Sequence, residues 1–287
     1  MKKLVLPIDD MEVSFDACTS SIIDKTERSR FNSILADLIV LSDEYFEAGR
    51  GGEIYTIVPN DCSILENPAI VGSITSDEFI MLYGYNMVKR PQGRAVYNRI
   101  MAAAKEECPF CGGIGHTKNL DHYLPKASFA QYSVFPANLI PSCRDCNMEG
   151  KGSGFAKAAK DQLIHPYLDK DLIFNEQWVF ARVIDGSSQD VVIEYYVNPP
   201  EIWSDIDKSR VKNHFKKFDL AKRYSIEAGR ELSGLLDQRN SSLEKLGANS
   251  FKEALITPIS ESDKLFANHW RKVMYNALET DFDFYQC

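Results

Sequence analysis

The sequence predicts an α+β fold in which a compact metal-bound centre lies between mostly helical flanking regions. Apolar residues recur at intervals of three and four over much of the chain before residue 105 and after residue 205, which is typical of amphipathic helices. Two β-rich runs lie between residues 172 and 200, and two Cys-x-x-Cys pairs stand near the middle of the chain. We therefore expect three parts: a helical N-terminal region (1–105), a central zinc-bound region (106–170) and an α+β C-terminal region (171–287).

The composition is that of a folded globular protein. Of the 287 residues, 44% are apolar and 26% are charged, and the sequence contains no internal repeat or low-complexity segment. The apolar run after Met1-Lys2-Lys3 is too short for a signal peptide, and no stretch reaches the roughly 18 apolar residues of a membrane helix. We therefore expect a cytoplasmic protein that does not enter a membrane.

The N-terminal region is predicted to contain three helices and one strand, whereas residues 1–20 show no clear period. Each element is bounded by a residue type that favours its start or its end. The predicted elements are a helix over 27–51 that ends at Gly51-Gly52, a strand over 52–58, a helix over 77–88 capped by Ser76, and a helix over 94–107 that follows Pro91-Gln92-Gly93.

The C-terminal part of the chain is predicted to begin with a helix and a hairpin and to continue as helices. SGFAKAAKDQL (153–163) predicts a helix that stops before His165-Pro166. The β-rich runs on either side of Gly186-Ser187-Ser188 predict a β-hairpin. From Asp205 onward the pattern is helical, with a last helix expected over 262–279.

The net charge of −8 excludes a protein whose whole surface binds nucleic acid, because phosphate binding requires many lysines and arginines. Any such contact must therefore be local. Residues 208–223 are the most basic stretch, with seven Lys/Arg and one acid. On a helix they form a lysine stripe opposite an apolar face: Lys208, Lys212 and Lys216 opposite Val211, Phe215 and Phe218. The stripe is either a surface that binds the nucleic-acid backbone or a solvated helix face.

Two cysteine pairs, Cys108 with Cys111 and Cys143 with Cys146, enclose 31 residues. Four thiolates at this spacing can hold a tetrahedral zinc ion, and the two glycines after the first pair permit the tight turn that such a site needs. Because four cysteines leave no open coordination position, the zinc is expected to be structural.

The other three cysteines, Cys18, Cys62 and Cys287, stand alone in the sequence. In a reducing compartment they are not expected to form disulfides, and we predict buried or inert thiols.

Polar residues inside the cysteine frame indicate chemistry beyond a structural zinc site. Asp121 and His122 interrupt the short apolar strand LDHYLP, where they are costly to bury without partners. Aspartate is a hard ligand for Mg²⁺, and histidine has the ordinary pKa best suited to general-base catalysis near neutral pH. Neighbouring side chains in a regular strand point to opposite faces, so a shared site requires a local distortion.

Two asparagines follow on the same segment. Asn138 lies in a second extended stretch, 136–141, where its amide could hold a loop or orient the histidine. Asn147 directly follows Cys146, so zinc would fix its backbone and let its side chain supply a second oxygen ligand. A cation with two protein ligands keeps positions for water and phosphate, as Mg²⁺-assisted phosphodiester cleavage requires. The alternative is that both asparagines are turn or capping residues.

Asp121-His122, Asn138 and Asn147 inside this frame resemble the HNH endonucleases of the ββα-metal class. The nine-residue step between the two asparagines, followed by Gly150-Lys151, resembles the nuclease domains of RNA-guided effectors and phage resolvases. The match covers about 45 of the 287 residues.

The resemblance implies a ββα-metal (HNH) nuclease core with a zinc knuckle within residues 106–170. His122 resembles the general base that activates water, Asp121 and Asn147 resemble the ligands of the catalytic cation, and Asn138 resembles the asparagine that braces the loop. The four cysteines resemble the structural zinc site of some family members. Asn147 stands where histidine is also found in the family, which favours Mg²⁺ or Mn²⁺ over softer ions.

Further basic residues are candidates for contact with nucleic acid. Lys126, Arg144 and Lys151 lie within or beside the cysteine frame, and Lys212 and Lys216 belong to the basic stretch. The alternative for each of them is a solvated surface charge.

The sequence thus predicts a metal-dependent HNH endonuclease that acts on DNA, with RNA left open as a substrate. No ATPase motif or base-reading helix is present, so we expect targeting or activation from elsewhere, as in an anti-phage effector that works with an ATPase. The rival prediction is a catalytically inactive zinc-knuckle protein that binds nucleic acid or another protein. Oligomeric state cannot be predicted from these patterns.

Overall fold

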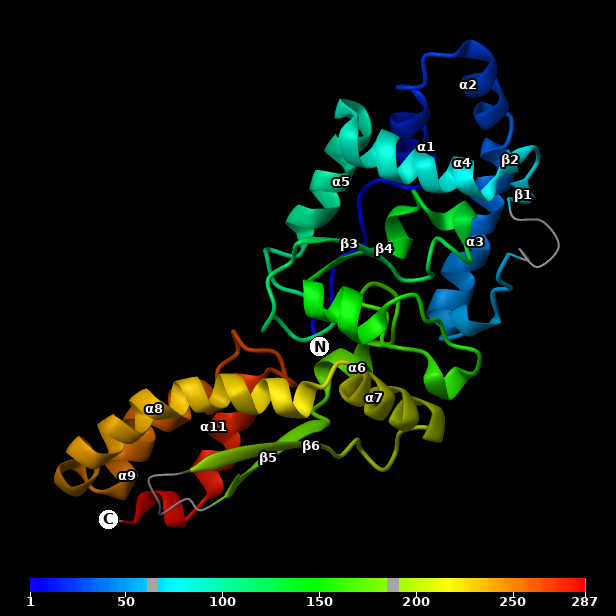
Figure 1. Ribbon diagram of the computed structural model, residues 1–287. Coiled ribbons are helices and arrows are strands. Elements are labelled where there is room, and N and C mark those ends of the chain that lie inside the picture. The colour runs from blue at the N-terminus through cyan, green and yellow to red at the C-terminus, as the bar shows by residue number, and fades with distance from the viewer. Residues whose placement is uncertain (61–66, 185–190, 287) are drawn as a thin grey trace. The chain divides into compact units, whose positions relative to one another are not determined.

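The computed structural model of the protein describes residues 1–60, 67–184 and 191–286 (Figure 1). The chain forms two units, Lys3–Lys170 and a second that combines Met1–Lys2 with Asp171–Cys287. Each unit has its own buried core, and the cysteine frame belongs to the first.

The unit Lys3–Lys170 is a set of helices around a short antiparallel sheet. Helix α5 packs against both strands of the sheet β3–β4, and α1 packs against α3 and α5 (Figure 1). Its elements are α1 (Met11–Thr19), α2 (Lys25–Asn32), α3 (Leu35–Gly51), β1 (Ala69–Val71), β2 (Ile74–Thr75), α4 (Ser76–Met81), α5 (Pro91–Ala103), β3 (Asn119–His122), β4 (Leu139–Ser142) and the helical segment η5 (Asp145–Lys151).

The N-terminal helices differ from the prediction in two respects. Residues 27–51 form two helices, because the Ser33 hydroxyl donates to the carbonyl of Arg30 at 2.7 Å and α2 ends there. The end of α3 is as predicted, with Gly52 in the left-handed conformation at φ 72°. Helix α1 was not predicted, although Asp10 caps it by accepting a hydrogen bond from the amide of Val13.

Two boundaries around α4 and α5 are also corrected. The N-cap of α4 is Thr75 rather than Ser76, because Thr75 and Glu78 form a reciprocal capping box. Pro91 was expected to separate two helices, but it is the first residue of α5. The helix ends at Ala103 rather than at residue 107. Glu107 then forms an isolated bridge with His116.

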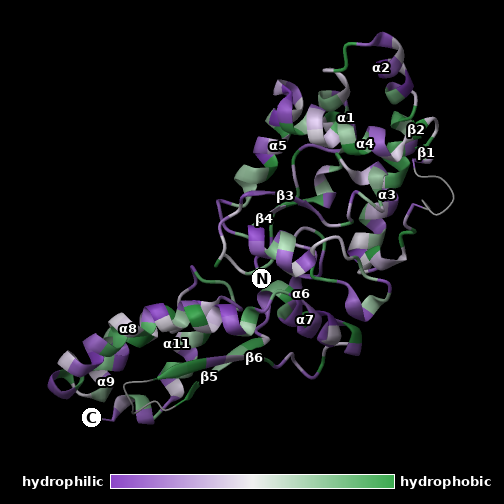
Figure 2. Cartoon of the chain, viewed as in Figure 1, coloured by the Kyte–Doolittle hydropathy of each residue, from purple (hydrophilic) through white to green (hydrophobic). Residues whose placement is uncertain are grey.

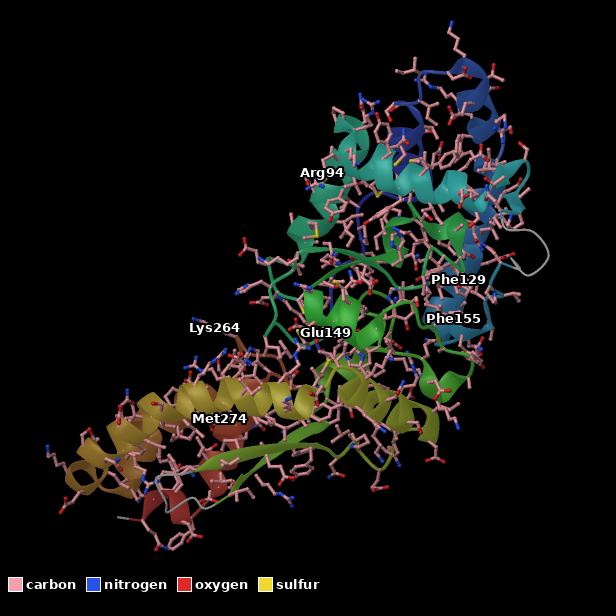
Figure 3. The ribbon with its side chains drawn as sticks, viewed as in Figure 1. Arg94, Phe129, Glu149, Phe155, Lys264 and Met274 are labelled. Atoms are coloured by element: carbon pink, nitrogen blue, oxygen red, sulfur yellow. The ribbon has the colours of Figure 1, made fainter. Side chains whose placement is uncertain are left out.

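Two predicted elements are wrong because tertiary contacts override local propensity. Instead of the strand expected over 52–58, the chain forms a helical turn at Ile54–Thr56. The Tyr55 amide donates its hydrogen bond to the side chain of Gln162 and not to a neighbouring strand. Of the helix expected over 153–163, only Ala159–Asp161 is helical. Phe155 is not helical, and its ring packs edge-on against that of Phe129, with ring centroids 5.0 Å apart (Figure 3).

The C-terminal unit packs helices against one β-hairpin. The predicted hairpin is confirmed: β5 and β6 pair antiparallel from Val179↔Val197 to Ile184↔Val192, and the turn that joins them lies outside the described residues. Helix α11 packs on β5, and α8 packs on β6. The elements are α6 (Asp171–Asn175), β5 (Val179–Ile184), β6 (Val192–Val197), α7 (Asp205–Lys217), α8 (Leu220–Leu246), α9 (Ala248–Phe251), α10 (Thr257–Ser260) and α11 (Trp270–Thr280).

The helices of this unit follow the predicted pattern, except that the last one begins at Trp270 rather than residue 262. His269 caps it, with its side chain accepting from the amide of Arg271. Polar and apolar residues alternate around α8, in keeping with a helix that has one buried face (Figure 2). Within the described ranges, no helix combines the length and the apolar character that a membrane span requires.

Candidate functional site

The four cysteines of the two Cys-x-x-Cys pairs come together in one cluster. Their sulfur atoms all lie within 4.8 Å of one another, and the sulfurs of Cys111 and Cys143 are 4.0 Å apart. All four side chains are buried. This arrangement can hold a zinc ion in tetrahedral coordination, as the spacing predicts.

The local backbone conformation positions the cysteines of the cluster. Gly112 and Gly113 have φ values of 65° and 92°, and Gly113 donates its amide to the carbonyl of Cys108 at 2.9 Å, which closes the turn. The amide of Gly115 donates to the sulfur of Cys111 at 3.4 Å. The second pair enters the helical segment η5, where the Asn147 amide donates to the carbonyl of Cys143 at 3.0 Å.

The electrostatics of the cluster favour a bound cation. Burial raises the pKa of the Cys108 thiol well above its ordinary value, whereas hydrogen bonding to the neighbouring thiols lowers the pKa of Cys143. Four buried sulfurs cannot all ionise without a compensating charge, and a divalent ion supplies it. Cys18 lies apart from the cluster, and burial raises its pKa to about 12; Cys62 and Cys287 lie outside the described residues.

Strand β3 carries Asp121 and His122, whereas Asn138 ends a helical turn, Pro136–Asn138, instead of lying in the extended stretch predicted over 136–141. Strand β3 pairs with β4, which begins at the next residue, Leu139. The two strands pair antiparallel, with Asp121 opposite Ile140 and His122 opposite Leu139. The amide of Tyr123 then donates to the carbonyl of Asn138, so the hairpin continues for one more residue. Asp121 and His122 are only 6% and 7% exposed.

His122 is held in one neutral tautomer. Its Nε2 lies 2.9 Å from the carbonyl oxygen of Ser133, and since a carbonyl can only accept, Nε2 carries the proton. The lone pair is therefore on Nδ1. Burial lowers the pKa of His122 to about 3, so the imidazole is neutral at neutral pH and its Nδ1 carries no proton. The ring also packs edge-on against Tyr83, with centroids 4.4 Å apart.

Asp121 presents one satisfied and one unsatisfied oxygen. Its Oδ1 lies 3.5 Å from the Nζ of Lys151, while Oδ2 is buried and has no hydrogen-bond partner among the described residues. Burial raises the pKa of Asp121 to about 6, and Lys151 acts in the opposite direction. A buried carboxylate oxygen without a partner is costly, and a hard divalent cation is the ligand that would satisfy it.

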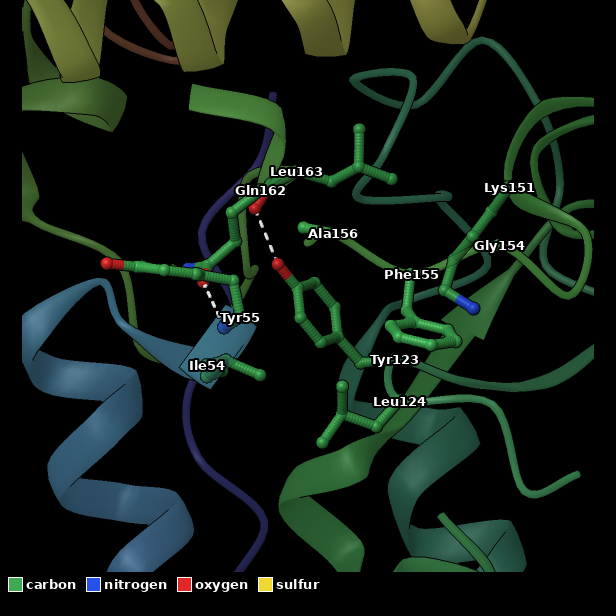
Figure 4. A pocket seen from close by; sticks show the side chains of 10 residues that line it. All are labelled: Ile54, Tyr55, Tyr123, Leu124, Lys151, Gly154, Phe155, Ala156, Gln162 and Leu163. Carbon is green, nitrogen blue, oxygen red and sulfur yellow. Dashed lines mark hydrogen bonds between the residues drawn. The ribbon is translucent and has the colours of Figure 1, made fainter. Parts of the chain in front are cut away.

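Lys151, at the end of η5, is also buried. Its Nζ donates to the carbonyl of His122 at 2.6 Å as well as contacting Asp121. Its side chain lines a small cavity of about 20 Å³ together with Tyr123, Phe155 and Gln162 (Figure 4). Among the described residues, the ammonium group of Lys151 is the cation that forms an ion pair with Asp121.

Asn138 lies behind the site and ties the loop that follows His122. Its Oδ1 accepts from the Leu124 amide at 2.7 Å and from the Tyr45 hydroxyl at 3.0 Å. Its Nδ2 donates to the carbonyls of Leu124 and Tyr132. Asn138 is fully buried, so these four hydrogen bonds are shielded from water.

Replacing Asn138 by alanine is expected to lower the free energy of unfolding by about 2–4 kcal/mol, because four buried hydrogen-bonding groups lose their partner. Asn147→Ala is the matched control and should cost less than about 0.5 kcal/mol, because Asn147 makes one exposed side-chain hydrogen bond. Urea unfolding followed by far-UV circular dichroism measures both. Equal losses in the two variants would contradict this account.

Asn147 lies in the helical segment η5, directly after Cys146. Its Nδ2 donates to the Oδ1 of Asn119 at 2.9 Å, which leaves its own Oδ1 as the atom able to bind a cation. The side chain is only partly buried.

Five of the predicted site residues line one surface depression of about 460 Å³. They are Asp121, His122, Lys126, Asn147 and Lys151. The neighbouring residues Asp121 and His122 thus line the same depression. The depression is also lined by Tyr83 and Tyr97, which the sequence patterns did not single out.

The other predicted residues lie elsewhere. Arg144 is exposed at the start of η5 and does not line the depression. Lys212 and Lys216 are exposed on α7, in the C-terminal unit, while Val211 and Phe215 are buried as expected.

Two residues that the sequence analysis missed contact the site residues from other positions in the chain. Ser133 orients His122 through its backbone carbonyl, and Tyr45 holds Asn138 through its hydroxyl. A carbonyl contact leaves no signal in sequence, and Tyr45 falls on the buried face of a helix, where an apolar role is the ordinary expectation.

The comparisons with known proteins give one match along the whole chain. No family model matches the sequence, and no solved structure matches it. Protein ea31 of Escherichia phage lambda is 36% identical over 298 residues, covering 100% of this chain and 99% of the phage protein. The chain therefore belongs to the same family as protein ea31 of phage lambda.

Proposed function

We propose that the protein is a metal-dependent endonuclease of the HNH type that hydrolyses phosphodiester bonds in DNA. The observation that carries this proposal is the unpartnered, buried Oδ2 of Asp121 in the same depression as His122. A cation-binding oxygen beside a neutral, oriented imidazole supplies the two groups that phosphodiester hydrolysis needs.

In this mechanism His122 acts as the general base. Its Nε2–H bond to the Ser133 carbonyl fixes the ring and leaves Nδ1 to take a proton from the attacking water. Asp121 and Asn147 would hold Mg²⁺ or Mn²⁺, which supplies positive charge for the departing 3′ oxygen. Asn138 keeps the loop after His122 in place, so the base does not move away from the phosphate.

The test is cleavage of supercoiled plasmid, single-stranded DNA and an RNA of the same sequence with Mg²⁺ or Mn²⁺, comparing the protein with Asp121→Ala at equal zinc content. Cleavage that requires the divalent ion and is lost in Asp121→Ala supports the proposal. Cleavage of RNA alone assigns the other substrate. Absence of cleavage, with zinc bound and the fold intact, points either to a missing activating partner or to the non-catalytic zinc-knuckle protein.

Lys151 is expected to compete with the catalytic cation, because its ammonium group contacts Asp121. Lys151→Gln removes the charge but keeps a donor for the His122 carbonyl, and it should bind Mn²⁺ roughly tenfold more tightly. Lys157→Gln, at an exposed lysine, is the control and should not change the affinity. Titration followed by electron paramagnetic resonance measures free Mn²⁺. Unchanged or weaker binding in Lys151→Gln would show that the lysine does not compete.

A role as an anti-phage effector with an ATPase partner stays a prediction. The relative that matches along the whole length comes from a phage, so the biological role must also suit a phage-encoded protein. Co-purification of the tagged protein from infected cells, with identification of the bound proteins, tests whether an ATPase accompanies it.

A further inference from the structure

Two cationic side chains are held on tyrosine rings that line the depression of Asp121 and His122; Lys126 lines the depression itself, whereas Arg94 reaches it only through its contact with Tyr97. The Nζ of Lys126 lies 4.8 Å from the centre of the Tyr83 ring, and the guanidinium carbon of Arg94 lies 4.3 Å from the centre of the Tyr97 ring. Both rings line the depression. Arg94 projects from α5 (Figure 3), three residues before Tyr97 in the same helix. Contacts of this kind fix a flexible cation in position.

The two tyrosines are themselves fixed to the strand that carries Asp121. The hydroxyl of Tyr83 donates to the carbonyl of Leu120, and the Leu120 amide donates to the hydroxyl of Tyr97, both at 3.3 Å. Leu120 directly precedes Asp121 in β3. The backbone carbonyl and amide of Leu120 thus hold the two tyrosines, and the tyrosines hold the two cations. Both cations are in this way connected to β3, the strand that carries Asp121.

Arg94 and Lys126 carry charges that no described carboxylate neutralises. Neither has a carboxylate partner within the parts of the chain that the structure describes, although the net charge is −8. Arg99 on the same helix is different, because it forms a bidentate pair with Asp9 at 2.8 and 2.9 Å. Two unpaired cations beside a catalytic depression fit an anionic ligand.

The geometry also indicates which part of a nucleic acid they meet. The rings of Tyr83 and Tyr97 are 8% and 7% exposed, so they are not available to stack on bases. Lys126 and Arg94 stand on the rings, and cations of this kind bind phosphate oxygens without reading the bases.

We propose that Arg94 and Lys126 form a phosphate clamp, which binds backbone phosphates close to the one that is cleaved. Tyr97 and Tyr83 set the spacing between this clamp and the site of Asp121 and His122. The proposal rests on the proposed nuclease function for the identity of the ligand, and it implies binding that is independent of base sequence at these contacts.

The clamp is tested by fluorescence anisotropy with a short fluorescein-labelled DNA duplex, in the absence of Mg²⁺ and Mn²⁺, over a series of salt concentrations. Arg94→Gln and Lys126→Gln should each weaken binding roughly three- to tenfold and lower the slope of log Kd against log salt by about 0.9. The double variant should lower it by about twice as much. Arg99→Gln is the matched control, because its charge is already paired, and should leave the slope unchanged.

The positioning role of Tyr83 and Tyr97 is tested separately. Tyr97→Phe and Tyr83→Phe keep a ring beneath each cation but lose the hydrogen bond to Leu120. They should bind DNA with unchanged affinity and salt slope, while kcat for cleavage falls several-fold at unchanged KM. Tyr97→Leu, which removes the ring, should also weaken binding. A fall in affinity for Tyr97→Phe equal to that for Tyr97→Leu would overturn the positioning role.

Failure of the clamp and failure of the nuclease function can be told apart. If the protein cleaves DNA but Arg94→Gln and Lys126→Gln bind it with unchanged affinity and slope, the clamp is wrong and the nuclease stands. If the variants lose affinity as stated but the protein cleaves nothing, the phosphate-binding surface stands without the enzyme. Equal weakening by Arg99→Gln, or no binding of DNA by the protein, overturns the clamp.

Discussion

His122→Ala should lower the rate of DNA cleavage by about 10²–10⁴-fold while zinc content and DNA affinity stay unchanged. The reason is geometric: the Ser133 carbonyl fixes the proton on Nε2 and leaves Nδ1 as the only basic nitrogen of the ring. Burial keeps the imidazole neutral, so the basic form is already present at neutral pH. Single-turnover cleavage with saturating enzyme measures the chemical step without a contribution from product release.

The matched control is His116→Ala. His116 is exposed, follows the first cysteine pair and does not line the depression of Asp121 and His122, so its loss should not change the cleavage rate. Added imidazole should restore part of the rate of His122→Ala, because it can occupy the space left by the side chain. If His122→Ala cleaves at the normal rate, another group activates the water and the assignment of the base is wrong.

The cysteine cluster could be predicted from sequence because its information is local. A Cys-x-x-Cys pair brings two sulfurs close within one turn, and two such pairs need only a common ion to meet. The strands β3 and β4 were recognisable in part as short apolar runs, but the predicted extended stretch 136–141 begins with a helical turn, Pro136–Asn138, and only Leu139 onward pairs with β3. The hairpin β5–β6 could be predicted from two β-rich runs around a turn, and this pattern is also local in the sequence.

The partners that give these residues their chemistry could not be predicted in this way. The carbonyl of Ser133, the ammonium of Lys151 and the rings of Tyr83 and Tyr97 reach the site from different parts of the chain. Their contacts depend on how helices and loops pack. The same reason explains the missing helix over 153–163, where packing of Phe155 outweighs a sequence with good helical propensity.

Cys143→Ser should abolish stoichiometric zinc binding and destabilise the unit Lys3–Lys170 more than any other single change considered. A structural zinc site contributes about 10–16 kcal/mol of binding free energy, which is coupled to folding. We expect Tm to fall by at least about 10 °C. Elemental analysis of the purified protein and thermal unfolding measure the two effects. Cys18→Ala is the control, because Cys18 is buried but lies outside the cluster, so zinc content should stay normal.

Gly115→Ala tests the cluster without changing any sulfur. A Cβ at this position would lie 2.5 Å from the sulfur of Cys143 and 2.7 Å from its Cβ, so Cys143 must move and zinc affinity must fall. Gly84→Ala adds the same methyl group where no atom lies within 4 Å, and it should bind zinc normally. Because Asn147 lies directly beside the second cysteine pair, the loss of zinc in Gly115→Ala should also reduce DNA cleavage. Excess zinc should restore that cleavage, whereas excess Mg²⁺ should not. Full zinc content in Gly115→Ala would contradict the clash with Cys143, and loss of zinc with normal cleavage would show that the position of Asn147 does not depend on the cluster.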